Sequence, residues 1–375
     1  MENALTFNVS LDCGLNYNAS SLCQTSITHL ILPVLYSVMF LTSLSGNVLS
    51  LWVFVYKISE KSPTHIYIIN LGLSNLLLCL VMPFLVAYYS RGHSWHTNHL
   101  ICKVATNGLM PILHANICVG MSILTWLALS RLATLIKHSH SNRPSRCTRI
   151  LPSVFLQQLR HKRFAWMACL ATWLVVVAIL IPTTIMYSAN TTEEQESWLP
   201  CYNKAAEVGV NQSQMTAIVG IIAFFLCFLL VLSSYFAVMR HICRLRRCSA
   251  ISNSHRVYAR VYRNIVVIQV VLATCLLPHH VFKAIFVKMA FHHTSSEDTA
   301  EQCHSLSSYV EVKNLFLCLA VLRCSTDPIM YFLLDKTFRK QTLRLLLLVS
   351  TNGSGQSTGS MQECGRTSQG SKAMQ

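Results

Sequence analysis

The sequence predicts an all-α membrane protein, a bundle of seven transmembrane helices followed by a short amphipathic eighth helix. Three observations support this fold class. Hydrophobic residues make up 53% of the 375 residues and charged residues only 12%, about half the charged share of a typical globular protein. Six long stretches contain no Asp, Glu, Lys or Arg, and the basic residues gather in alternate connections between the apolar stretches.

Each apolar stretch has, or approaches, the roughly 20 residues that a helix needs to cross about 30 Å of hydrocarbon. The six uncharged stretches are 28–56, 64–90, 104–130, 164–192, 208–239 and 264–282. The seventh, 314–334, is apolar except for Arg323 and Asp327. A basic amphipathic run then predicts the eighth helix at 335–348. We therefore expect an N-terminal segment at 1–26, a transmembrane domain at 27–334 and, after the eighth helix, a disordered tail at 349–375 that is rich in Ser, Gly, Thr and Gln.

The distribution of Lys and Arg predicts the orientation of the chain. The connections 57–63, 137–163 and 240–263 and the segment after 334 hold 2, 7, 7 and 6 basic residues. The N-terminal segment and the other connections hold only Arg91, Lys103, Lys204 and Lys288, besides Lys283 and Lys313 next to the ends of the sixth and seventh apolar stretches. The positive-inside rule then places the N-terminus outside the cell and the C-terminus in the cytoplasm of a multi-pass plasma-membrane protein. The net charge of +16 is expected to attract anionic membrane lipids and not nucleic acid, because it flanks the spans.

The outer segments carry features of an oxidising, glycosylating compartment. Glycosylation sequons begin at Asn8, Asn18 and Asn190. Disulfides are expected among the outer cysteines, and their odd number leaves one thiol unpaired or paired elsewhere. The outer cysteines are Cys13, Cys23, Cys102, Cys201 and Cys303.

Short motifs follow one another along the seven stretches. They are Gly46-Asn47-Val48, Asn70-Leu-Gly-Leu-Ser-Asn75, Cys102 with Cys201, Leu129-Ser130-Arg131-Leu132, Trp173, Cys275-Leu-Leu-Pro278-His-His280 and Asp327-Pro328-Ile329-Met330-Tyr331. In this order they resemble the rhodopsin-like (class A) G-protein-coupled receptors, and the last two resemble the purinergic-like branch. Three stretches, 62–67, 130–135 and 323–328, resemble one orphan receptor in particular. The resemblance implies a receptor and not an enzyme, with no cofactor.

The resemblance also implies roles for individual residues. It implies a disulfide between Cys102 and Cys201, and one between Cys303 and either Cys13 or Cys23. A heterotrimeric G-protein, of the Gi/o class by analogy with the branch, would contact the inner end of the bundle, with Arg131, Tyr235 and Tyr331 taking part in coupling. Pro278 and Pro328 would act as kinks about which the helices move.

A basic ligand pocket is expected in the outer half of the bundle. Lys283, Lys313 and His280 stand where the purinergic-like branch holds cationic residues that grip phosphate or carboxylate groups. The alternative is that each Lys extends its ammonium group to the membrane interface. Leu113 argues against an amine receptor and Val321 against a photoreceptor, because each replaces the ionisable residue that those receptors require at its position. The extracellular ligand itself stays unknown.

The inner half departs from the family pattern. Asn75 replaces the Asp that holds a sodium ion in most members, and Arg323 replaces a neutral polar residue of that site. We expect Arg323 to substitute for the ion, held by Asp327 and by the Asn75 and Asn47 amides, because an unpaired cation in the bilayer is costly. The alternative is that Arg323 faces a water-filled cleft.

Arg131 lacks the acidic neighbour that usually neutralises it, since position 130 is Ser, and 240–263 contains no acid. We therefore expect basal signalling. A non-signalling scavenger or heteromer partner is one alternative. Another is a proton sensor that uses the outer histidines His93, His96, His99, His292, His293 and His304. No tetrahedral metal-ligand spacing is present, and neither a transporter repeat nor a protease motif supports another class.

Overall fold

The computed structural model describes residues 27–90, 108–139, 153–190, 211–248, 252–294 and 302–354, and these are almost entirely helical. The long helices are α1 (Leu32–Trp52), α2 (Pro63–Ser90), α4 (Met110–Ser139), α6 (Lys162–Asn190), α8 (Asn211–Cys248), α9 (Ser252–Thr294) and α10 (Gln302–Leu334). The π-helical turns η1 (Ile27–Ile31) and η2 (Val53–Lys57) flank α1, and the shorter helices are α5 (Ser153–Gln158) and α11 (Lys336–Ser354).

Within the described residues, seven helical segments are long and apolar enough to cross a membrane, which confirms the predicted fold class. They are Thr28–Lys57, Pro63–Ser90, Pro111–Thr134, Lys162–Pro182, Ala217–Arg240, Ile265–Met289 and Tyr309–Leu333. Each overlaps one of the stretches expected from the sequence. The sixth reaches beyond its predicted end at 282, because α9 continues through Lys283 and Lys288.

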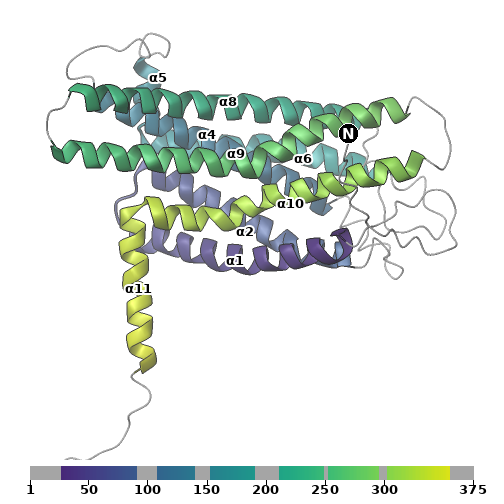
Figure 1. The fold of residues 1–375 in the computed structure, drawn as a ribbon, viewed down its shortest axis with the longest axis horizontal. Coiled ribbons are helices and arrows are strands. Elements are labelled where there is room, and N and C mark those ends of the chain that lie inside the picture. The colour runs from purple at the N-terminus through teal and green to yellow at the C-terminus, as the bar shows by residue number, and fades with distance from the viewer. Residues whose placement is uncertain are drawn as a thin grey trace, which may run out of the picture.

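The long helices lie alongside one another as a bundle, and α11 projects from one end of it at a steep angle (Figure 1). Helix α1 packs against α2 and α10, α2 against α4, α4 against α6 and α8, α8 against α9, and α9 against α10. The packing therefore closes into a ring. Large apolar side chains such as Leu41, Leu80 and Val219 are exposed on its outside, as expected for a surface that faces lipid.

Two of the sequence motifs meet where α1 packs against α10. Pro328 lies inside α10, and a Cβ on Gly46 would lie only 2.8 Å from Cγ of Pro328. Gly46 is thus the residue that lets the two helices approach at the proline. Figure 1 also shows α9, which contains Pro278, changing direction along its length, as expected where proline removes a backbone donor.

Helix α11 is joined to the bundle by a cap and an aromatic cluster. One carboxylate oxygen of Asp335 accepts hydrogen bonds from the backbone N–H groups of Thr337 (2.8 Å) and Phe338 (3.0 Å). The buried Phe338 ring stacks on Phe54 of η2, with ring centroids 5.0 Å apart, and meets the Tyr331 ring edge-on. The helix ends at Ser354, six residues beyond the predicted end at 348.

Candidate functional site

A buried ion pair lies between the membrane-spanning helices. Arg323 and Asp327 stand one turn apart on α10, and their side chains are 3% and 10% exposed. The Arg323 Nη1 donates to Oδ2 of Asp327 at 2.9 Å, and Nη2 donates to Oδ1 of Asn75 at 3.3 Å. Asn75, from α2, donates in turn to the same Asp327 oxygen at 2.9 Å. The three side chains form a closed triangle, so the cation is paired within the bundle.

Asn47 of α1 extends this triangle without contacting Arg323. It accepts a hydrogen bond from Asn75 Nδ2 at 3.0 Å, and its own amide donates to the Cys324 carbonyl at 2.9 Å. The expected direct contact between Asn47 and the guanidinium is not formed, because the Asn75 side chain lies between them. Asn47 therefore positions Asn75, and through it the ion pair, from the opposite side.

A glycine on α4 makes room for the guanidinium. A Cβ on Gly120 would lie 2.9 Å from Cζ of Arg323 and closer still to Nη2. No sequence motif marks this glycine, because the requirement arises only when α4 packs opposite Arg323. Removing either partner of a buried ion pair leaves an uncompensated charge, which typically costs about 3–5 kcal/mol. The positive charge of Arg323 beside Asp327 is therefore a fixed part of the folded bundle, and its removal should destabilise the fold.

A second group of basic residues lies in the half of the bundle that the charge distribution predicts to be extracellular. The His279 side chain is buried. Lys283, Lys313 and His114 are close enough to interact with it electrostatically. The His114 and His279 rings, from α4 and α9, are 6.1 Å apart between centroids, and the Lys313 ammonium group lies 5.1 Å from the Phe286 ring centre. Lys283 is partly buried, and no carboxylate of the described residues lies within ion-pair distance of it. Three helices therefore bring cationic or titratable groups together.

The structure places His280 differently from its neighbour. Its ring stacks on Phe224 of α8, with centroids 3.5 Å apart, and Nδ1 lies 3.0 Å from the Leu276 carbonyl oxygen. His280 is thus engaged in packing between α8 and α9. His279, which the sequence analysis did not select, is the histidine whose Nδ1 is buried without a hydrogen-bond partner in the described part of the chain. Although His279 and His280 are adjacent on α9, their rings therefore contact different neighbours.

The end of the bundle that the charge distribution predicts to be cytoplasmic holds the residues expected to meet a G-protein. Arg131, near the inner end of α4, lies within electrostatic range of Tyr331 of α10. Ser130 donates to the Leu159 carbonyl oxygen at 3.2 Å and does not engage Arg131. Among the described residues, no carboxylate lies within ion-pair distance of Arg131. Tyr235 is buried at the inner half of α8.

Several expected sites lie outside the described residues. These are Cys13, Cys23, Cys102, Cys201, Asn8, Asn18, His93, His96 and His99. Asn190 is the last residue of α6. Cys303 and His304 lie in the first turn of α10, and His292 and His293 in the last turn of α9.

Comparison with known sequences decides the family. Residues 46–331 match the family described as "7 transmembrane receptor (rhodopsin family)". The chain belongs to the rhodopsin family of seven-transmembrane receptors. It is therefore a multi-pass plasma-membrane receptor and not an enzyme. As for the family in general, it is expected to respond to an extracellular ligand and to couple to a heterotrimeric G-protein.

The receptor is similar over nearly its whole length to two curated mammalian proteins. It is 36% identical to the "Probable G-protein coupled receptor 82" of Homo sapiens over 346 residues, which are 92% of this chain and 100% of that protein. It is 38% identical to the mouse protein of the same name over 331 residues, 88% of this chain and 98% of that one. A purinoceptor of Meleagris gallopavo is 24% identical over 87% of this chain and 83% of its own length. The expected resemblance to an orphan receptor of the purinergic-like branch is confirmed.

Proposed function

We propose that this receptor transduces an extracellular anionic ligand, of nucleotide-like or lipid-like chemistry, to a heterotrimeric G-protein of the Gi/o class, and that it signals without ligand. The cluster of Lys283, Lys313, His279 and His114 supports the anionic ligand. Buried or half-buried cations bind phosphate or carboxylate through charge-assisted hydrogen bonds. Lys283 carries most of this argument because no described carboxylate pairs with it.

The orientation of the proposed receptor follows the distribution of basic residues, with the N-terminus outside and the C-terminus in the cytoplasm. We infer glycans on Asn8, Asn18 and Asn190 and a disulfide between Cys102 and Cys201. Pairing of Cys303 with Cys13 or Cys23 belongs to the same proposal. The basic cluster then opens toward the extracellular side, and Arg131 faces the G-protein.

The anionic-ligand proposal is tested by thermal unfolding of the purified receptor with pairs of compounds that differ in charge. Adenosine triphosphate against adenosine, and lysophosphatidic acid against monoacylglycerol, are suitable pairs. We expect one anionic compound to raise the Tm of the wild type while its neutral counterpart does not. The rise should disappear in Lys283→Gln. Lys288→Gln is the matched control, since Lys288 lies on the same helix and is exposed. An equal rise in Lys283→Gln, or with the neutral compounds, would contradict the proposal.

Basal signalling is the second part of the proposal, and Arg131 supports it because no described carboxylate pairs with its guanidinium. In an inactive receptor an ion pair would hold this guanidinium away from the G-protein, and loss of such a pair shifts the equilibrium toward the active state. We expect ligand-free receptor to accelerate nucleotide exchange on purified Gi/o, and Arg131→Ala to remove most of that acceleration. Equal exchange by wild type and Arg131→Ala would instead support the non-signalling scavenger or heteromer partner.

A further inference from the structure

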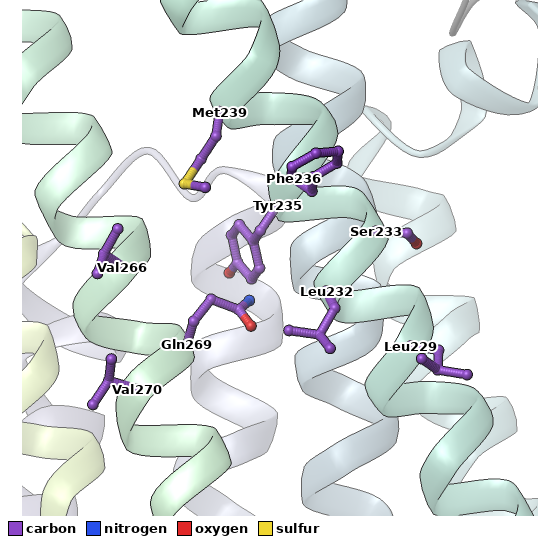
Figure 2. Close-up of a pocket in the computed structure, with 9 residues that line it drawn as sticks. All are labelled: Leu229, Leu232, Ser233, Tyr235, Phe236, Met239, Val266, Gln269 and Val270. Carbon is purple, nitrogen blue, oxygen red and sulfur yellow. The ribbon is translucent and has the colours of Figure 1, made fainter.

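A groove of about 550 Å³ opens between α8 and α9 on the outside of the bundle. This volume is within the range of roughly 300–1,000 Å³ found for small-molecule sites. Leu229, Phe236 and Val270 line it and are 60%, 52% and 58% exposed. Both helices are membrane spans at this level, so the exposed side of the groove faces hydrocarbon. Figure 2 shows Gln269 of α9 and Tyr235 of α8 in the gap between the two helices.

Gln269 is a polar residue that lines the groove. Both amide atoms of Gln269 are buried, and neither has a hydrogen-bond partner in the described part of the chain. Figure 2 shows this amide between α9 and α8, beside Tyr235. An amide that cannot reach water or a protein partner is costly at membrane depth. The amide therefore indicates that a polar group from another molecule enters the groove.

The inner rim of the groove is positively charged. The Arg240 guanidinium lies 4.5 Å from the centre of the Phe236 ring, and Phe236 is a lining residue. Arg240 is the last residue of the α8 span. Arg263 is exposed two residues before the α9 span begins, and Gln269 lies about 9 Å deeper along that helix at 1.5 Å per residue. From the end of the spans toward the membrane interior, the groove thus presents a cationic rim, then a buried amide and then an apolar channel.

We propose that this groove binds one anionic phospholipid of the cytoplasmic leaflet. Its phosphate pairs with Arg240, an ester carbonyl accepts a hydrogen bond from the Gln269 amide, and an acyl chain packs along Leu229 and Val270. A membrane helix from a partner protein fits less well, because its backbone groups are already bonded internally, so that only a polar side chain of that helix could reach the amide, and it would leave the cationic rim without an anion. The assignment to the cytoplasmic leaflet rests on the orientation proposed above, whereas the choice of an anionic lipid follows from the positive charge at the rim.

The proposal is tested on the full-length receptor by native mass spectrometry from micelles that contain equal amounts of palmitoyl-oleoyl phosphatidylserine and phosphatidylcholine. We expect the wild type to retain phosphatidylserine in preference. Val270→Trp, which fills the groove from its lipid-facing side, should reduce retention about tenfold, and Gln269→Leu should reduce it by a similar factor through loss of the hydrogen bond. Arg240→Ala should remove the preference for phosphatidylserine.

Two control variants keep the test specific. Leu230→Trp adds the same bulk on α8 at an exposed position that does not line the groove. Lys57→Ala removes another cation that lies over an aromatic ring, Trp52, at the inner end of its span. Both should retain phosphatidylserine as the wild type does. Wild-type retention by Val270→Trp, or receptor dimers in place of lipid adducts, would overturn the proposal. The readout needs neither ligand nor G-protein, so it is independent of the signalling proposal.

Discussion

At the scale of single residues, Gly120→Ala tests the packing of α4 against the buried ion pair. The new Cβ would overlap the Arg323 guanidinium, and overpacking of this kind typically costs about 1–3 kcal/mol. We expect a lower Tm for the detergent-solubilised variant. Gly220→Ala is the matched control, because a Cβ on Gly220 meets no heavy atom within 4 Å, and its Tm should not fall. Combining Gly120→Ala with Arg323→Ala should be less harmful than the sum of the two changes; strict additivity would contradict the contact.

The ion pair also shows what the sequence can and cannot predict about single residues. Arg323 could be paired with Asp327 because Arg323 is an unusual cation within a span and Asp327 lies one turn away. Asn75 could be added because it stands at the same site in the family pattern. The indirect role of Asn47 could not be predicted, since it depends on how α1 and α2 rotate. Gly120 was missed for a similar reason: a glycine has no polar signal, and its importance arises from a neighbour on another helix.

At the scale of secondary-structure elements, hydropathy predicted the spans well and the eighth helix only in part. The expected end of that helix at 348 was set by the onset of Ser, Gly and Thr. The structure continues the helix to Ser354. Its expected start at 335 lies one residue before the observed start at Lys336, and Asp335 is the N-cap of the helix.

The cap at Asp335 predicts a local loss of stability in α11. Asp335→Ala removes the oxygen that accepts from the backbone of Thr337 and Phe338, at a typical cost of about 1 kcal/mol. We expect faster hydrogen exchange at these two amides, by about fivefold, when α11 opens locally. Asp335→Asn keeps a capping oxygen and should exchange nearly as slowly as the wild type. Equal exchange in the Ala and Asn variants would show that the aromatic contacts of Phe338 alone hold the helix.

At the scale of the whole molecule, hydropathy and charge identify seven spans because the membrane excludes charge whatever the topology. They do not predict which helices touch, since an apolar helix offers several equivalent faces to its neighbours. The closed ring of helix contacts from α1 to α10 could therefore not be predicted from the sequence. The same limit explains His279 and His280: both were visible in the sequence, but only the packing of α8 decides which ring is used for stacking and which joins the basic cluster.

The fixed charge of Arg323 predicts how the whole bundle responds to sodium. A mobile cation can shift the equilibrium between receptor states only if it binds them with different affinities, and here the guanidinium already occupies the position beside Asp327 and Asn75. Replacing choline chloride by sodium chloride should therefore change neither the Tm nor the basal nucleotide exchange of the wild type. Arg323→Ser removes the cation and leaves Asp327 unpaired, so sodium should raise the Tm of this variant. Arg323→Lys keeps a cation there and should remain insensitive. A sodium response in the wild type would show that Arg323 does not take the place of an ion.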